Sequence, residues 1–309
     1  MARAKDSINR LSEIRVEQLG QRVFQRKPIA SLMIGVLAWL VIAGLVNAFV
    51  SSPYLSWQVV GKYFFNIQIL HGLSVTLLLF GTTAIIGYTL GIIVAAIRMA
   101  ENGVLRSVAT FYIWLFRSVP MLVQFLFWFN IAAIFPSIGI GLPFGSELSS
   151  LTQHLFGFAV HTTLFSVDAN KVTSVMTVAI IAMGLHEVAY AAEVIRGGIA
   201  SVDPSQRRAA VSLGLSRGRI LRRIILPQAM RGMLPTLGNR AINIIKDSSL
   251  ASVISLADLL YSAQLIYNRT FEVMPLLIVA SLWYLVLTGL VDFIQKRLEL
   301  RFGRGMTVE

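Results

Sequence analysis

The sequence contains no cysteine and has few charged residues. Without cysteine, the chain has neither a disulfide framework nor a thiolate metal site. Its four histidines show no metal-ligand spacing: His71, His154, His161 and His186. Charged residues make up 14% of the 309 positions and hydrophobic residues 56%, and the mean hydropathy is +0.72. A soluble protein of this composition would expose large apolar patches, so the composition indicates a membrane protein.

Signatures of nucleotide binding and hydrolysis are also missing. The chain has no G-x-x-x-x-G-K-[ST] phosphate loop, so it cannot by itself cradle ATP. It contains neither a G-x-S-x-G nucleophile elbow nor an H-E-x-x-H zinc motif. We therefore expect that the chain is not an enzyme, with no catalytic residue, no metal and no cofactor of its own.

Long apolar runs supply the expected membrane spans. A helix needs about 20 predominantly apolar residues to cross a bilayer. About six runs qualify: 29–50, 69–97, 118–136, 173–195, 230–258 and 273–295. The run 29–50 exceeds the roughly 7–15 residues of a signal-peptide core, so a retained anchor helix is expected. Residues 104–117 are predicted to form a helix along the membrane surface before the third span.

Positive charge is unevenly divided between the two sides that these spans define. The segments 1–28, 98–106, 196–231 and 296–309 share one side and hold 21 of the 27 lysines and arginines. The loops of the other side hold three, namely Lys62, Lys171 and Arg269. This asymmetry follows the positive-inside rule and predicts that both termini are cytoplasmic. Orientation and anionic headgroups thus account for the net charge of +12, and we expect no nucleic-acid partner.

A basic, polar segment at residues 203–227 interrupts the apolar pattern. Asp203 is a candidate helix cap, Pro204 fits the first helical position, and Gln206 falls where a capping-box partner would lie. These signals predict an amphipathic helix that starts after Asp203.

The same segment carries a predicted stop and a second start. Gly214 is expected to end the first helix in a left-handed conformation, and Ser216 to cap a second short helix that ends at Pro227. Two short helices at an angle would form a rigid projection to which another protein could bind.

Two spans carry polar stripes. At 100° per residue, about 120° of arc on the fifth span contains Asn239, Arg240, Asn243, Lys246 and Asp247. The fourth span has a similar arc with His186, Glu187, Tyr190 and Glu193. A charge at the centre of a spanning helix costs at least about 2.5–3.5 kcal/mol, so such residues face a wet cavity or each other. We expect the stripes to line a solute path, with helix–helix contacts as the alternative.

Residues of both charge signs are candidates for this path. Glu187 could hold an ammonium or guanidinium group, and Lys246, Ser248 and Ser249 could hold a carboxylate. A zwitterionic or cationic amino acid would suit this mixture. The complete set of predicted path residues is Glu187, Tyr190, Asn243, Lys246, Asp247, Ser248 and Ser249.

Some features have simpler structural explanations. Gly87 and Gly91 form a small-xxx-small pair that predicts close helix packing. Glu193 could pair with Arg196 in a purely structural role. The external loop 137–172 is either a contact surface for a delivery protein or a passive connection.

A collinear series of motifs runs from Gly72 to Gln264. It comprises Gly72-Leu73-x-Val75-Thr76-Leu77, Phe116-Arg117-Ser118-Val119-Pro120, Ala189-Tyr190-x-x-Glu193-x-x-Arg196-Gly197-Gly198, Pro227-Gln228-Ala229, Lys246-Asp247-Ser248-Ser249-Leu250 and Ala263-Gln264. Between them, the segment 203–227 contains Ala209-Ala210, Gly214 and Ile224-x-Leu226-Pro227. This series resembles the polar amino acid uptake branch of the permease subunits of bacterial ABC importers, and 203–227 resembles their EAA coupling loop.

The resemblance implies an all-α membrane protein with a type I ABC importer permease-like helical bundle. A five-helix core at 69–295 would carry one extra N-terminal transmembrane helix at 29–50, with a basic cytoplasmic segment 1–28 and a cytoplasmic tail 296–309. Implied partners in the bacterial inner membrane are two ATP-binding subunits that hold ATP and Mg, a second permease, identical or paralogous, and an extracytoplasmic solute-binding protein. The implied ATPase-coupling residues are Asp203, Gln206, Arg208, Ala209, Ala210, Gly214, Leu215, Ile224, Leu226 and Pro227.

The sequence departs from the family pattern at Arg208, where the coupling loop usually starts with Glu. Either the partner ATPase presents an acidic groove to Arg208, or the permeases form a mixed pair in which the other subunit binds the ATPase more strongly. A different function is an ion-coupled secondary carrier or channel that uses Glu187, Lys246 and Asp247. Inverted repeats would favour a carrier, and the two halves of the sequence show none.

Overall fold

The structure is a computed structural model that describes residues 29–52, 55–135, 137–141, 145–157, 163–168 and 174–303. The predicted segment 1–28, Lys171 and the end of the tail lie outside the described residues. The chain divides into two compact units, residues 1–56 and 57–309. The first contains helix α2 (Ile29–Val50), which has the bounds predicted for the first span. None of its apolar window is buried within the protein, as a lipid-facing helix requires.

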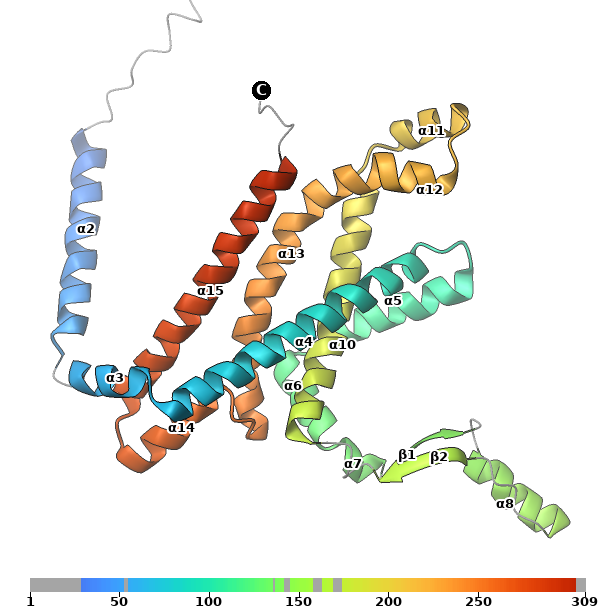
Figure 1. The fold of residues 1–309 in the computed structure, drawn as a ribbon, viewed down its shortest axis with the longest axis horizontal. Helices are drawn as coiled ribbons and strands as arrows, with labels where there is room; N and C mark the ends of the chain where they lie inside the picture. The colour runs from blue at the N-terminus through green and yellow to red at the C-terminus, as the bar shows by residue number, and fades with distance from the viewer. Residues whose placement is uncertain are drawn as a thin grey trace, which may run out of the picture. The chain divides into compact units, whose positions relative to one another are not determined.

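The second unit is built almost entirely from helices (Figure 1). They are α3 (Trp57–Phe64), α4 (Ile67–Arg98), α5 (Gly103–Ser118), α6 (Met121–Phe129), α7 (Ile131–Ile134), α8 (Gly145–Phe156), α10 (Val175–Ala200), α11 (Pro204–Ser212), α12 (Arg217–Ile220), α13 (Leu226–Ser248), α14 (Leu259–Thr270) and α15 (Val273–Gly303). In the described residues, four helices are long and apolar enough to span a membrane, and six spans result if two bent pairs are counted. The predicted all-α class and span number are confirmed.

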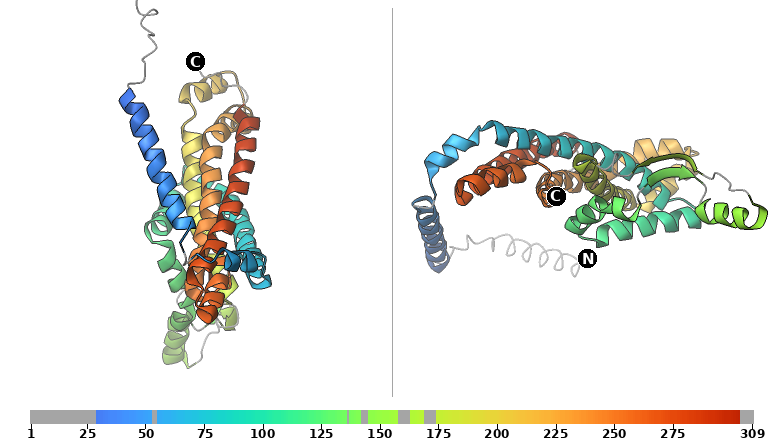
Figure 2. Two further views of the ribbon diagram at one scale, coloured as in Figure 1. Left: turned by 90° about the vertical axis from the view of Figure 1, so that its left-hand side faces the viewer. Right: turned by 90° about the horizontal axis from the view of Figure 1, so that it is seen from below.

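Helices α10, α13 and α15 lie side by side, and the long helix α4 crosses α10 and α13 (Figures 1 and 2). Small residues allow α4 and α10 to approach closely. A Cβ added at Gly91 would lie 2.7 Å from the Cβ of Ala191, and one at Gly87 would lie 2.5 Å from the Cγ of Glu187. The predicted packing role of Gly87 and Gly91 is therefore confirmed.

The third predicted span, 118–136, is wrong as a continuous helix. Helix α5 ends at Ser118, and α6 leaves it at an angle of 102°. Pro120 explains the break, because it lacks an N–H and disfavours helical backbone at the preceding residue. Helix α5 has nearly the bounds predicted for the surface helix 104–117.

The fifth predicted span has different ends from those expected. A continuous helical run extends from Arg217 through a π turn (Leu221–Ile225) into α13, so no second short helix ends at Pro227. The N–H of Leu226 reaches back to the carbonyl of Leu221, and this wider turn accommodates the missing N–H of Pro227.

Helix α14 occupies most of the segment 259–272, which the predicted spans leave as an external loop. A 3-10 turn (Ser249–Ile254) follows α13, and Ser255 adopts a left-handed conformation that ends it. Asp258 then caps α14, because its Oδ1 accepts the N–H of Tyr261 at 2.8 Å. The chain bends by 46° at this break.

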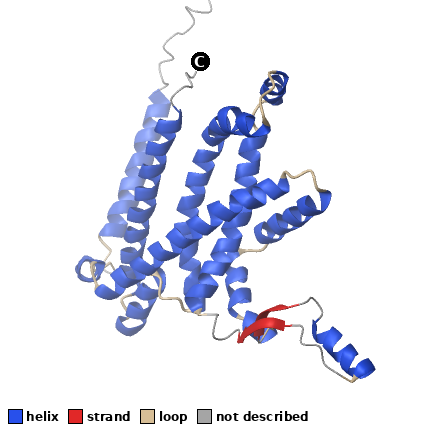
Figure 3. Cartoon of the chain, turned by 45° about the vertical axis from the view of Figure 1, so that its right-hand side comes forward, coloured by secondary structure: helices blue, strands red, loops and turns tan. Residues whose placement is uncertain are grey.

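One β-hairpin departs from the all-α pattern (Figure 3). Strand β1 (Ser137–Gly141) pairs antiparallel with β2 (Thr163–Asp168), with Ile138 opposite Val167. Between the two strands in the sequence lies α8. The predicted external loop 137–172 is therefore partly structured.

Candidate functional site

Helices α11 and α12 project from the ends of α10 and α13, as Figure 1 shows. The Oδ1 of Asp203 accepts the N–H of Ser205 at 2.8 Å, and Pro204 is the first residue of α11, as predicted. Because the Asp203 carboxylate accepts this hydrogen bond, the pKa of the side chain lies below its usual range.

The turn between α11 and α12 depends on Gly214. Its φ of +70° confirms the predicted left-handed stop, and Leu215 closes the turn by donating its N–H to the carbonyl of Ala210 at 3.2 Å. Ser216 occupies the predicted cap position of α12, but its side chain makes no capping hydrogen bond.

Gln206 does not form the predicted capping box. Its Oε1 accepts a hydrogen bond from Nε2 of Gln228 at 2.6 Å, and the same amide donates to the carbonyl of Ile224 at 2.8 Å. Gln206 thus links α11 to the first turn of α13. Helix α11 is therefore held at both ends. This contact joins its start to α13, and the Gly214 turn joins its end to α12.

The outer surface of α11 and α12 combines arginines with apolar side chains. Exposed arginines are Arg207, Arg208, Arg217, Arg219, Arg222 and Arg223. Leu213 is 80% exposed and Val211 59%, whereas Ala210 and Ile220 are buried beneath them. Among the other predicted coupling residues, Ala209, Leu226 and Pro227 are exposed, and Leu215 and Ile224 are half-buried. Within the described residues, Arg208 forms no ion pair. This surface suits a protein partner with acidic and apolar groups.

A second candidate site lies where α4, α10 and α13 meet. Glu187 on α10 accepts two hydrogen bonds from Arg240 on α13, from Nη2 at 2.5 Å and from Nε at 3.4 Å. The Glu187 side chain is 1% exposed and that of Arg240 13%. This buried ion pair joins the two predicted polar stripes, and the predicted path residue Glu187 is occupied by Arg240.

Aromatic and amide groups surround the guanidinium. Arg240 lies over the ring of Tyr190, with its Cζ 4.1 Å from the centroid, and Arg117 approaches the same ring at 5.2 Å. Nε2 of Gln124 donates to the carbonyls of Phe116 and Val119, both at 2.9 Å, and lies 3.0 Å from Nδ1 of His186. The two carbonyls take both hydrogens of that amide nitrogen, and which group donates in the contact with His186 depends on the tautomer of the ring.

A small cavity of about 10 Å³ adjoins the ion pair. Its lining includes Glu187, Asp247, His186 and Thr83. Thr83 is 1% exposed, and its Oγ1 has no hydrogen-bond partner among the described residues. Buried hydroxyl groups normally have a partner, so this cavity has an unsatisfied polar group in its wall.

The remaining predicted path residues do not join this cavity. Lys246 is exposed, and Asn243 is half-buried on α13. Ser248 and Ser249 donate their hydroxyls to the carbonyls of Ile245 and Lys246 on their own helix, both at 2.7 Å. The expectation that Lys246, Ser248 and Ser249 hold a carboxylate stays a prediction, and none of the three lines the cavity beside Glu187. Glu193 and Arg196 form the predicted structural pair at 2.6 Å.

Sequence reasoning missed several members of these polar clusters. Arg240 appeared in the stripe without a partner, although an arginine in an apolar helix signals a buried acid elsewhere. Gln124 was not identified as a site residue from the sequence. Asp258 was only the last residue of the predicted fifth span, and it is buried and accepts a hydrogen bond from the hydroxyl of Tyr284 at 3.2 Å.

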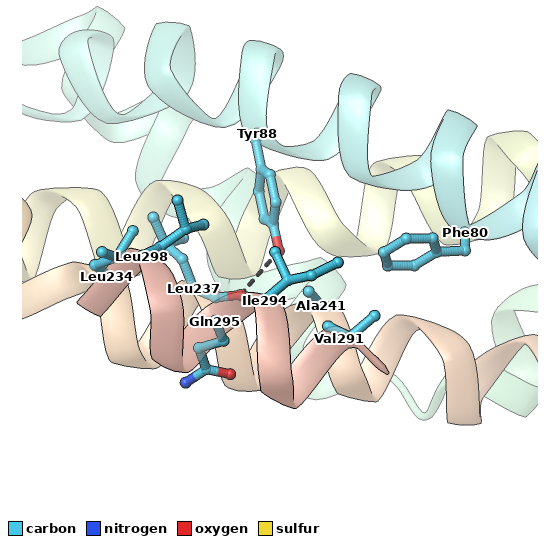
Figure 4. Close-up of a pocket in the computed structure, with 10 residues that line it drawn as sticks. Phe80, Tyr88, Leu234, Leu237, Ala241, Val291, Ile294, Gln295 and Leu298 are labelled. Carbon is cyan, nitrogen blue, oxygen red and sulfur yellow. Dashed lines mark hydrogen bonds between the residues drawn. The ribbon is translucent and has the colours of Figure 1, made fainter. Parts of the chain in front are cut away.

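A larger cavity of about 430 Å³ lies between α4, α13 and α15 (Figure 4). Its lining is apolar except for Tyr88 and Gln295, and the hydroxyl of Tyr88 donates to the carbonyl of Leu237 at 2.9 Å. Gln295 uses its amide nitrogen for Pro235 and Glu299. Such a lining suits hydrocarbon rather than a polar solute.

Comparison with known proteins places the chain in a clear context. The family described as "Binding-protein-dependent transport system inner membrane component" matches residues 87–304. The "Arginine transport system permease protein ArgU" of Corynebacterium glutamicum is 35% identical, over 90% of this chain and 80% of that protein. The "Probable amino-acid ABC transporter permease protein YckA" of Bacillus subtilis is 32% identical, over 88% of this chain and 99% of that protein.

Solved structures agree with the sequence matches. A chain from a structure titled "Crystal structure of an amino acid ABC transporter with histidines" is 29% identical, has a TM-score of 0.61, and covers 81% of this chain and 99% of its own length. A chain of a bacterial alginate ABC transporter, 14% identical with a TM-score of 0.56, covers 92% of this chain and 99% of its own. The latter likeness concerns the fold alone.

Proposed function

The chain belongs to the family of binding-protein-dependent transport system inner membrane components, and we propose that it forms the translocation path of an ATP-driven importer for a polar or charged amino acid. Work would enter from a separate ATPase through residues 203–227. The names of the similar permeases, for arginine and for amino acids in general, support this substrate class.

The exposed pair of helices α11 and α12 is the observation that carries the proposal. A short helix exposing Val211 and Leu213 in water is unfavourable unless a partner covers these side chains. The Gly214 turn and the Gln206–Gln228 contact hold the pair in one shape. A rigid projection continuous with the spanning helix α13 is suited to pass a partner's movement into the membrane.

The charge of this surface indicates the chemistry of the partner. Residues 196–231 contain eight basic side chains and one acid, Asp203. Charge complementarity favours an ATPase with an acidic groove at Arg208, rather than the basic one that the family's usual Glu would match. In the alternative, a mixed permease pair, the other subunit binds the ATPase more strongly. A change of Arg208 would then leave recruitment of the ATPase unchanged.

The further partners follow from the family. Two ATP-binding subunits would hold ATP and Mg, and a second permease, identical or paralogous, would complete the path. An extracytoplasmic solute-binding protein would deliver the amino acid on the side opposite α11 and α12. This arrangement puts both termini and the arginine-rich helices in the cytoplasm of a bacterial cell, in agreement with the distribution of basic residues.

An ion-coupled carrier built on Glu187, Lys246 and Asp247 is the less favoured function. Membership of a binding-protein-dependent family argues against it, and Glu187 is already neutralised by Arg240.

Reconstitution tests the proposed function directly. The permease is placed in liposomes with candidate ATPases and a solute-binding protein, and uptake of labelled amino acids is measured with and without ATP. We expect uptake only with ATP and an ATPase that binds α11 and α12. Accumulation without any ATPase would contradict the proposal.

A further inference from the structure

We propose that Glu187 and Arg240 receive the ammonium and carboxylate groups of the transported amino acid, and that in the closed path they neutralise each other. This inference rests on the proposed function and names the side chains that recognise the substrate. It assigns the carboxylate to Arg240 in place of Lys246.

The geometry of the pair points to an exchangeable contact. Arg240 presents two nitrogen donors to the two carboxylate oxygens of Glu187, at 2.5 and 3.4 Å. A planar guanidinium fork binds any carboxylate in the same manner, whether it belongs to a glutamate or to a free amino acid. The ring of Tyr190 supports the guanidinium from its face, so the donor edge can change partners without losing that contact.

Buried ion pairs gain little stability compared with apolar residues of similar size, because desolvation offsets the attraction. Two facing helices could therefore be joined more simply by apolar side chains. Separating the pair, however, leaves two uncompensated charges in a dry environment, which is strongly unfavourable. An incoming molecule with both a carboxylate and an ammonium group compensates both charges at once. A molecule with only one of these groups leaves a charge unpaired.

The space around the pair is closed in this structure. The adjoining cavity of about 10 Å³ has room for at most about one ordered water. An amino acid can therefore enter only if α10 and α13 move apart. Gly87 of α4 packs directly against Glu187, so the pair closes the junction of three helices.

The cavity wall also contains a free hydrogen-bonding group. Thr83 on α4 places an unpartnered, buried hydroxyl in the same wall as Glu187. An unsatisfied buried hydroxyl is costly, and an ammonium group bound at Glu187 would supply a donor for it. Each of the three helices at this junction thus contributes a group suited to the charged end of an amino acid.

Direct binding tests the inference with variants that keep the junction folded. The single changes each strand a buried charge, so the informative protein is the double variant Glu187→Gln/Arg240→Met. A matched control removes another ion pair of similar length on α15 with Asp292→Asn/Lys296→Gln. Each protein is assembled with its ATPase in lipid nanodiscs without the delivery protein. Equilibrium binding is then measured for labelled L-arginine, L-glutamine, L-glutamate and L-histidine.

We expect the double variant to bind the preferred amino acid at least about tenfold more weakly than the wild type, since two charge-assisted contacts are lost. Its thermal stability and its recruitment of the ATPase should match the wild type, and the control should bind normally. If the double variant binds as tightly as the wild type, or if the wild type binds none of the four amino acids, the inference is overturned. Failure of the wild type to recruit any ATPase would instead contradict the proposed function.

Modified ligands separate the two roles. For arginine, the amide removes the carboxylate charge and N-acetylation removes the ammonium charge. The wild type should reject both, Arg240→Met should no longer distinguish arginine from its amide, and Glu187→Gln should no longer distinguish arginine from the N-acetyl form. Unchanged discrimination in both folded variants would show that the pair is only a structural link.

Discussion

Gly87 and Glu187 meet across the α4–α10 contact so closely that a β-carbon on Gly87 would lie 2.5 Å from Cγ of the glutamate. A real Cβ does not approach another carbon to this distance, so the glycine makes room for the carboxylate. The packing of two spanning helices and the position of a buried charge are therefore set by the same residue.

Gly87→Ala is expected to destabilise the protein by about 1–3 kcal/mol, as overpacking of a tight contact usually does. Thermal unfolding of the purified permease in detergent, monitored by tryptophan fluorescence, measures this effect. Gly81→Ala on the same helix is the control, because no atom lies within 4 Å of the Cβ it would add. A Gly87→Ala protein as stable as Gly81→Ala would contradict the tight contact.

Gly214→Ala should loosen the arrangement of α11 and α12. The site has open space, but its φ of +70° costs a residue with a Cβ about 1–2 kcal/mol. Gly218→Ala introduces the same methyl group into open space without a positive φ, and helix propensity should make it neutral or stabilising. Hydrogen exchange of residues 204–220 is expected to accelerate in the first variant alone. Equal exchange in both would mean that the left-handed turn does not hold the two helices.

Arg208→Glu should weaken recruitment of the ATPase about tenfold if an acidic groove faces this residue, since reversal of a charge at an interface turns attraction into repulsion. Binding of the purified ATPase to the immobilised permease measures the effect, which should shrink as salt is raised. Arg301→Glu, an exposed change on α15, is the matched control. Tighter recruitment by Arg208→Glu would indicate the basic groove typical of the family. Unchanged recruitment would indicate that the ATPase binds mainly to the other permease.

The stability of α11 should depend on acid through Asp203. Its pKa is lowered in the folded protein, because the ionised carboxylate accepts the N–H of Ser205. The contribution of this cap is therefore complete above the unfolded pKa of about 3.9 and is lost as the pH falls through the lower folded value. Hydrogen exchange of α11, corrected for intrinsic rates, should show this loss. Asp203→Asn keeps the acceptor without titrating, so its protection should stay flat over the same range.

Local chemistry made part of this structure predictable from the sequence. Asp203, Pro204 and Gly214 each act within a few residues of themselves, and the helix start and stop appear where expected. Hydropathy located the long helices α2, α4, α10 and α15 for the same reason, since the apolar run itself is the signal. Proline was the exception: Pro120 broke a helix, whereas Pro227 was absorbed by a π turn. Its effect depends on whether the neighbouring backbone can widen its turn.

The candidate site was only half accessible to this reasoning. Helical periodicity placed Glu187 and Arg240 on the polar faces of their helices, but not which face meets which. The two residues are 53 positions apart, and their contact depends on how α10 and α13 pack. For the same reason the sequence pointed to Lys246, and not to Arg240, as a carboxylate receptor. Gln206 was misassigned because its partner, Gln228, belongs to another helix.

The π turn at Leu221–Ile225 has a mechanical consequence. Because it keeps the helix unbroken past Pro227, one continuous helical run extends from Arg217 to Ser248, with Pro235 inside it. Arg219 and Arg240 are separated along it by about 30 Å, at the helical rise of about 1.5 Å per residue. If this run moves as one body, a pivot of about 5° displaces its far end by about 3 Å, roughly the length of the hydrogen bond that Arg240 would have to release. A tilt of this size at the arginine-rich end would thus be large enough to break the hydrogen bonds of Arg240 at the other end.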